Sequence, residues 1–277
     1  MCNVCVTHGY GKTWYKHAEN YARQMYKLRK PGQVPKEAGT DPESQASLII
    51  QEAIEAKAVA PERFDEMRKT ALKLVTQYSV GQAVPIQEAE KVVDLASPIA
   101  LMGCICRRQV RGRLEDNDKT YSCMGLGVGM FKWDRWPERY KGAVEFVTPE
   151  EAKKWLRKWN KMGMMHILMT FGTPYLGGVC NCDYPDCLAI RWRLDYGITS
   201  SCVKAEYVAK VDYDACSGCT ECVSRCQFGA IKMEVTTRKA NIDLLRCFGC
   251  GLCETGCAYG AINLVERQSI PVLRNVW

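Results

Sequence analysis

A block of cysteines that occurs twice near the C-terminal end is the strongest constraint on how this chain folds. Residues 212–233 align with residues 243–264 at a constant offset of 31 and without a gap, and nine positions are identical. All four cysteines of each block are among them: Cys216, Cys219, Cys222 and Cys226 in the first block, and Cys247, Cys250, Cys253 and Cys257 in the second. We therefore expect two similar structural halves in the last quarter of the chain.

Cysteine is abundant in the whole chain, with 17 among 277 residues. At this density cysteines form disulfides, bind metal or act in catalysis. The first residues lack the basic and apolar segments of a secretory signal, and residues 163–180 contain a histidine, a proline and four glycines, which is a poor membrane span. We therefore expect a cytoplasmic protein without a transmembrane segment, in which thiols bind metal because disulfides do not persist there.

The spacing within each block, Cys-x-x-Cys-x-x-Cys-x-x-x-Cys, is the ligand run of a bacterial-type ferredoxin. Three thiolates on a tight loop can hold three corners of a [4Fe-4S] cubane, while the fourth enters a short helix and points toward the other cluster. A zinc ribbon needs neither the triple run nor its duplication. Two clusters are assigned, one to Cys216, Cys219, Cys222 and Cys257, and the other to Cys247, Cys250, Cys253 and Cys226.

On these motifs, residues 205–266 resemble a two-cluster [4Fe-4S] ferredoxin. The resemblance implies a pseudo-twofold domain of short hairpins and small helices that holds two cubanes close enough for one-electron exchange. Strands are expected at residues 206–211, 231–235, 240–243 and 262–265. The chain departs from the family at Gln227 and Ala258, where the family usually has proline, and this leaves the solvent exclusion and the potentials of the clusters open.

Six upstream cysteines predict at least one additional [4Fe-4S] cluster. Its core is expected to be Cys180, Cys182 and Cys187, with a fourth ligand from Cys104, Cys106 or Cys123. Six thiols are more than one cluster needs. Either some of them surround the third cluster without binding it, or a fourth cluster exists that also uses Cys2 and Cys5 as ligands. A zinc site at Cys2, Cys5 and one of His8 or His17 is an alternative for the N-terminus, and so are ordinary exposed thiols. Cys202 is expected to be a small buried residue.

The predicted fold class is α+β in three parts: a helical region over 1–80, a central α/β domain over 81–203 and the two-cluster domain with its tail over 204–277. Helices are expected at residues 14–30, 42–58 and 61–79. In the central domain we expect one structural unit to occur twice: a helix, a strand and a turn with Cys-x-Cys. In the first copy the helix begins near residue 84 and the strand is at 99–102. In the second copy the helix begins near residue 147 and the strand is at 164–169. Thr148 and Glu151 have the spacing of a capping box. This part is also similar to iron–sulfur proteins of anaerobes that carry such turns before a C-terminal ferredoxin module.

The charge of the chain does not require a nucleic-acid partner. The formal value is +7, from 38 basic and 31 acidic residues. Each thiolate-bound cubane contributes about −2, so two clusters leave about +3 and three leave about +1. The run Arg107, Arg108, Arg111 and Arg113 is expected to offset cluster charge rather than to bind an acidic partner. The aromatic and basic stretches 133–141 and 155–161 are expected to be amphipathic helices rather than stacking platforms for single strands.

The sequence contains no nucleotide-binding loop, since G-x-x-x-x-G-K-[ST] is missing and residues 125–129 lack the third glycine of a dinucleotide site. No catalytic residue is assigned. The function expected is electron transfer, as the iron–sulfur subunit of a larger oxidoreductase whose partner subunit contains flavin, molybdenum or tungsten. Two alternatives stay open: an enzyme with its own active cluster or thiol pair in the central domain, and a cluster-bearing regulatory or nucleic-acid-binding protein.

Overall fold

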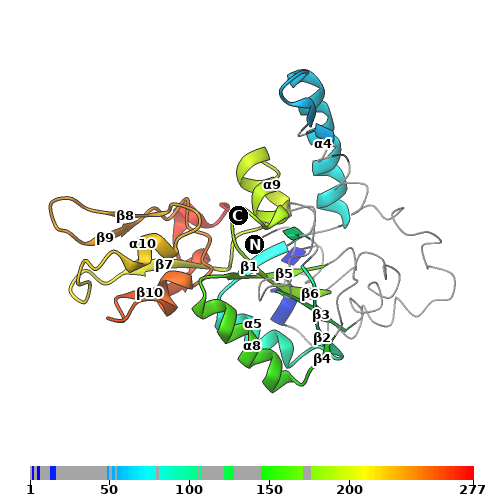
Figure 1. Cartoon of the computed structure of the whole chain (residues 1–277). Helices are drawn as coiled ribbons and strands as arrows, with labels where there is room; N and C mark the ends of the chain where they lie inside the picture. Colours follow the sequence, from blue (N-terminus) through cyan, green and yellow to red (C-terminus); the bar gives the residue numbers. More distant parts are fainter. Residues whose placement is uncertain are drawn as a thin grey trace.

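The fold consists of a six-stranded sheet covered by helices, with a smaller module at one end of it (Figure 1). The structure is a computed structural model, and it describes residues 2, 5–6, 13–16, 49, 52–53, 55–78, 81–104, 106–107, 122–127, 145–170 and 176–277. None of the helices in these residues is long and apolar enough to cross a membrane. Helices and antiparallel sheets occur together, which confirms the mixed α+β class.

The central sheet is antiparallel and has the order β1-β5-β6-β3-β2-β4. Its strands are β1 (Gly81–Val84), β2 (Ile99–Met102), β3 (Cys123–Leu126), β4 (Glu145–Phe146), β5 (Met165–Met169) and β6 (Gly178–Cys182). The order is symmetric about its middle: β1-β5-β6 on one half corresponds to β4-β2-β3 on the other. The strands and helix of residues 81–126 are therefore repeated in residues 145–182, and β3 and β6 meet at the centre.

This symmetry corrects the repeat expected from the sequence. Cys180 and Cys182 do not lie on a turn like the one that carries Cys104, because both belong to strand β6. Strand β6 corresponds to β3, and Cys123 of β3 is the cross-strand partner of Cys180. The pairing of strands far apart in sequence decides which cysteines are equivalent, and the local Cys-x-Cys pattern could not reveal it.

Two helices pack together on one face of the sheet, α5 (Ile86–Val93) and α8 (Pro149–Lys161), as Figure 1 shows below the strands. Helix α8 begins with the predicted capping box, in which the Thr148 hydroxyl accepts from the Glu151 amide at 3.3 Å and the Glu151 carboxylate accepts from the Thr148 amide at 2.8 Å. Such a cap stabilises a helix by about 1 kcal/mol. The side chains between these two helices and the sheet form one of the two cores of the central sheet, which we call the α5–α8 core.

The opposite face of the sheet forms the second core, which we call the thiol core. Because successive side chains of a strand alternate between faces, Val179 points to the helices while Cys180 and Cys182 point to the thiol core. Helix α9 (Leu188–Tyr196) lies on this side in Figure 1, with α4 (Pro61–Tyr78) beyond it. The alternation explains how a Cys-x-Cys sequence within a strand delivers both thiols to one place.

The C-terminal module is a pseudo-twofold pair of hairpin and helix units. It contains β7 (Tyr207–Val211), α10 (Glu221–Arg225), β8 (Ile231–Met233), β9 (Ala240–Ile242), α11 (Leu252–Thr255) and β10 (Ile262–Glu266). Strand β7 pairs with β10 and β8 with β9, both antiparallel. Equivalent bonds recur in each half: the Asp212 amide donates to the Ala261 carbonyl and the Asp243 amide to the Ala230 carbonyl, both at 2.8 Å. The four strands lie close to the ranges expected from the sequence.

The N-terminal region agrees with the sequence where it is described. The predicted third helix is α4, residues 49, 52–53 and 55–56 of the second are helical, and residues 14–16 of the first form the 3-10 turn η1 (Trp14–Lys16). Residues 57–58, expected at the end of the second helix, form a turn. The other residues of the first two expected helices, and the stretch 133–141, lie outside the described residues. The short turns η3 (Thr199–Ser201), η4 (Arg267–Ser269) and η5 (Pro271–Leu273) complete the chain.

Candidate metal centres

The eight duplicated cysteines surround two cavities of the C-terminal module. The outer cavity is lined by Cys216, Cys219, Cys222 and Cys257, and the inner cavity by Cys226, Cys247, Cys250 and Cys253. Each cavity takes three thiols from one block and the last thiol of the other block. This placement agrees with the ligand sets expected from the spacing.

Glycine is required at the loop that wraps each cavity. Gly218 has φ +77° and Gly249 has φ +68°, and a Cβ atom at these positions would lie 2.4 Å from the Arg238 carbonyl oxygen and 2.0 Å from the Tyr207 carbonyl oxygen. No side chain fits at such distances, and the left-handed backbone disfavours one in any case. The two close approaches are equivalent under the pseudo-twofold symmetry, so both loops are built in the same way.

Backbone amides point at the sulfur atoms in both halves. The Ala230 amide donates to Cys226 Sγ and the Ala261 amide to Cys257 Sγ, each at 3.3 Å. Cys247 Sγ accepts from two amides, those of Ala209 at 3.5 Å and Gly249 at 3.4 Å. Amide donors stabilise the thiolate form and tune the potential of a bound iron–sulfur centre. The donor set therefore fits [4Fe-4S] clusters: four thiols per cavity, with amides directed at their sulfurs.

The two cavities differ in their exposure to solvent. In the outer cavity Cys219 is exposed, and Ser217 and Glu221 contribute to the lining. The inner cavity is lined by Phe228 and Phe248, whose rings stack at a centroid distance of 3.8 Å. The inner cavity is thus the drier of the two.

Three cations lie near the inner cavity, of which Arg267 and Lys204 are buried and Arg193 is partly buried. The guanidinium of Arg267, which is 0% exposed, donates to the Cys247 carbonyl at 3.0 Å. Arg193 lies over the Phe248 ring at 4.8 Å from its centroid, and Lys204 donates to the Leu245 carbonyl. Burial, reinforced by the positive charges of Arg267 and Arg193, lowers the pKa of Lys204 to about 8. Buried positive charge calls for nearby negative charge, which a thiolate-bound cluster carries.

The six upstream cysteines form a closed ring of thiols in the thiol core. Cys123 Sγ donates to Cys180 Sγ at 3.5 Å, and the pKa of each of the six thiols is shifted by two neighbouring thiols of the group. We call this group the six-thiol ring; in order around it stand Cys104, Cys106, Cys187, Cys182, Cys180 and Cys123. The sequence singled out these six residues and left open whether those beyond four surround the cluster without binding it; the structure brings all six together.

The six thiols shift one another's pKa in both directions. Hydrogen bonds from Cys123 and Cys182 lower the pKa of Cys180 to about 7, and hydrogen bonds from two neighbours likewise lower the pKa of Cys104 and Cys187. The pKa of the three donors, Cys106, Cys123 and Cys182, is raised because each gives its proton to such bonds. Six thiols that converge in one core, five of them buried, are suited to binding a cationic metal centre.

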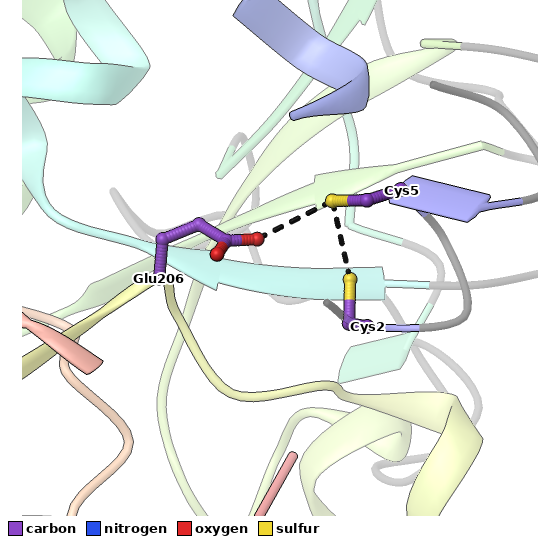
Figure 2. Close-up of side chains that lie close together, drawn as sticks. All are labelled: Cys2, Cys5 and Glu206. Atoms are coloured by element: carbon purple, nitrogen blue, oxygen red, sulfur yellow. Dashed lines mark hydrogen bonds between the residues drawn. The ribbon is translucent and has the colours of Figure 1, made fainter. Parts of the chain in front are cut away.

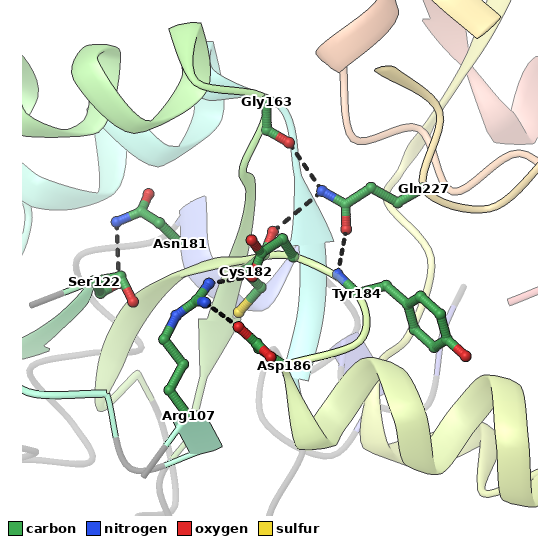
Figure 3. A network of polar contacts seen from close by, with 9 residues as sticks. Arg107, Ser122, Gly163, Asn181, Cys182, Tyr184, Asp186 and Gln227 are labelled. Atoms are coloured by element: carbon green, nitrogen blue, oxygen red, sulfur yellow. Dashed lines mark hydrogen bonds and ion pairs between the residues drawn. The ribbon is translucent and has the colours of Figure 1, made fainter. Parts of the chain in front are cut away.

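Arg107, the first residue of the arginine run, is buried beside the ring. Its guanidinium forms ion pairs with Asp183 and Asp186, which flank the turn between Cys182 and Cys187 (Figure 3). Its positive charge also contributes to lowering the pKa of Cys104, after the bonds from Cys106 and Cys123. The other three residues of the run, Arg108, Arg111 and Arg113, lie outside the described residues.

Gln227 joins the ferredoxin-like module to the six-thiol ring. It follows Cys226 of the inner cavity, and its amide group donates to the carbonyls of Gly163 at 2.9 Å and Cys182 at 3.3 Å, while its oxygen accepts from the Tyr184 amide at 2.9 Å (Figure 3). Proline could make none of these side-chain bonds. The departure from the family pattern at this position therefore has a structural reason, which the sequence flagged but could not explain.

The N-terminal cysteines are buried, which corrects the alternative of exposed thiols. Cys2 and Cys5 are each 1% exposed and belong to the α5–α8 core, not to the thiol core. Their carboxylate neighbour is Glu206, which the sequence did not single out. His8 and His17 lie outside the described residues. Cys202 is fully buried in the thiol core, as expected, and burial raises the pKa of its thiol.

One comparison bears on the identity of the module. Residues 215–261 match the family model of the 4Fe-4S dicluster domain. The match spans both cysteine blocks and supports an iron–sulfur, ferredoxin-like electron-transfer module. No curated protein matches the chain. The upstream domain therefore has to be understood from its own geometry.

Proposed function

We propose that this chain transfers electrons through three iron–sulfur centres, as a subunit of a larger cytoplasmic oxidoreductase. The outer and inner cavities would each hold a [4Fe-4S] cluster, and the six-thiol ring would hold a third centre. A redox subunit containing flavin, molybdenum or tungsten would be the partner. Clusters of this kind accept and donate single electrons when bound.

The position of the inner cavity is the observation that carries the proposal. Two of its cysteines, Cys226 and Cys250, pack against the thiol core that contains the six-thiol ring, and Cys226 also packs in the core of the C-terminal module. Gln227 adds a direct bond to the Cys182 carbonyl. The inner cavity thus stands between the outer cavity and the ring, which is the arrangement of a relay.

The outer cavity offers the contact with a redox partner. Cys219 is exposed, and Tyr259, which also lines this cavity, is 58% exposed. An electron donor or acceptor that docks there would come close to the first centre without any rearrangement. The polar lining at Ser217 and Glu221 fits a transient contact better than a permanent one.

The six-thiol ring also favours a second candidate, an enzyme whose own centre or thiol pair lies in the central domain. A [4Fe-4S] cluster needs four thiolates, so two thiols of the ring would remain for chemistry. In that case the outer and inner cavities would supply electrons to a reaction at the ring. A spectroscopic change at the ring on addition of a substrate would favour the enzyme, and its absence across candidate substrates would favour the carrier.

The proposal is tested by anaerobic redox titration of the full chain, followed by electron paramagnetic resonance. Three interacting centres should give split signals when neighbouring clusters are both reduced, since the inner centre couples to the two others. A Cys187→Ser variant should lose the third signal and keep the other two. Finding only two uncoupled signals in the wild type would contradict the relay.

A further inference from the structure

We propose that Cys2, Cys5 and Glu206 form a separate site for a single zinc ion. The three side chains converge from the N-terminal segment and from the residue just before β7 (Figure 2). Cys2 Sγ lies 3.3 Å from Cys5 Sγ, which lies 3.3 Å from Glu206 Oε1, and one ligand atom of each residue lies within 4.8 Å of the other two.

The distances suit one tetrahedral ion. Zinc binds sulfur at about 2.3 Å and carboxylate oxygen at about 2.0–2.2 Å, which puts two sulfurs about 3.7 Å apart and a sulfur and an oxygen about 3.5 Å apart. The observed separations of 3.3 Å need only a slight opening to reach these values. The donor set also points to zinc, since two thiolates and one carboxylate are ordinary zinc ligands, whereas [4Fe-4S] clusters take four cysteines.

The charges at the site call for a cation. Fully ionised, the two thiols and the carboxylate would carry three negative charges, although both sulfurs are almost completely buried. Such charges cannot coexist away from water without a partner. In the structure the side chains form hydrogen bonds in series, from Cys2 to Cys5 and from Cys5 to Glu206, which need the protons of both thiols. A divalent ion would take the place of these protons and release them to solvent.

The carboxylate of Glu206 is held in place by surrounding residues. The amide group of Gln82, which is 0% exposed, donates to Glu206 Oε1 at 3.3 Å and to the Lys204 carbonyl at 3.2 Å. Gln82 is held in turn by the Trp14 indole, which donates to its oxygen at 2.8 Å. Such outer bonds fix the orientation of a metal ligand and are typical of built metal sites.

Tyr15 provides an independent sign of a missing group. Its side chain is 2% exposed, yet its hydroxyl has no hydrogen-bond partner in the described part of the chain. Burial and the negative charges of Glu88 and Glu206 raise the pKa of this hydroxyl, and Cys5 also acts on it. The hydroxyl is therefore a buried donor that lacks an acceptor among the described residues.

A metal ion here would tie the N-terminal segment to the start of the C-terminal module. Glu206 immediately precedes β7, and its carbonyl accepts from the Arg267 amide at 2.7 Å. The ion would join segments 201 residues apart in sequence, so it would stabilise the folded state without taking part in electron transfer.

The test uses the full chain, loaded with iron and sulfide under argon and then given zinc sulfate. After desalting, metal analysis should find about one zinc per chain. X-ray absorption at the zinc edge should show two sulfur and two lighter neighbours. Cys5→Ser should abolish zinc retention and leave the iron content unchanged, and Glu206→Gln should weaken zinc binding by at least about tenfold.

Cys202→Ser is the matched control, because Cys202 is an equally buried thiol outside the site, and this variant should retain zinc like the wild type. If Cys5→Ser fails to fold, the absorption spectrum of the wild type and the affinity of Glu206→Gln still decide. The proposal is overturned if the wild type retains no zinc, if zinc has four sulfur neighbours, if Cys5→Ser keeps its zinc or loses iron, or if Cys2 and Cys5 are joined as a disulfide.

Discussion

Replacing Arg267 with glutamine should lower the reduction potential of the centre in the inner cavity. Arg267 is completely buried, and its guanidinium donates to the backbone carbonyl of Cys247 at 3.0 Å. Its positive charge therefore lies close to Cys247, whose thiol lines the inner cavity. Reduction adds negative charge to the centre, and a nearby cation favours the reduced state. Loss of the cation therefore shifts the potential downward.

The size of this shift follows from Coulomb's law. For a separation on the order of 7 Å and an effective dielectric constant of about 20, one charge contributes about 2 kcal/mol. For a one-electron couple, in which a tenfold change in equilibrium constant is 59 mV, this is on the order of 100 mV. The outer cavity is further away, so its potential should change much less.

The assay is a redox titration under argon, monitored by electron paramagnetic resonance, on the wild type and three variants. Arg267→Gln removes the charge, Arg267→Lys keeps it, and Arg274→Gln removes a charge from an exposed residue. Only Arg267→Gln should show the large shift at the inner centre. The reasoning is refuted if Arg267→Gln, with normal iron content, shifts by less than about a fifth of the expected value, or if the lysine variant shifts equally.

Three further predictions concern the same region. Gln227→Pro should remove three hydrogen bonds between the modules and slow electron exchange between the inner centre and the ring, measured by pulse radiolysis; Gln227→Glu, which keeps the acceptor, should be affected less. The reduction potential of the inner centre should fall as the Lys204 ammonium loses its proton. This step should occur at or above pH 8, because a negatively charged bound centre favours the protonated lysine, and Lys204→Met should lack it. Cys187→Ser should lower the iron content by about four per chain, since one [4Fe-4S] cluster would be lost.

Each of these predictions has its own contradicting result. Unchanged exchange rates in Gln227→Pro would show that the contact does not matter for transfer. A pH step that persists in Lys204→Met would assign the titration to another group. Iron content equal to the wild type in Cys187→Ser, with Cys202→Ser as the control, would remove the third centre from the account.

The C-terminal module was largely predictable because its information is local. The spacing of eight cysteines and the offset of 31 residues determine loops, short helices and strands within about sixty residues. Gly218 and Gly249 stand where the loop needs a left-handed backbone. Short-range patterns of this kind do not depend on the rest of the fold.

The site in the central domain was only partly predictable because its geometry depends on distant strand pairing. The sequence singled out all six thiols, but the pairing of Cys123 with Cys180 follows from the register of β3 and β6. The partly buried Glu206 and the buried Arg267 carry no signal in the sequence, since charged residues are usually exposed. His166 is buried, bonded to Asn181 at 2.7 Å, and burial lowers its pKa to about 4, so it is a neutral core residue.

Iron and acid-labile sulfide, counted together with Mössbauer spectra on the full chain isolated under argon, test the central claim most directly. The account predicts about eight irons and eight sulfides in tetranuclear clusters from the two cavities, and about four more of each if the ring binds one further cubane. The eight should remain when all six ring cysteines are replaced by serine. A colourless protein, or zinc in place of iron at the eight cysteines, would contradict the account.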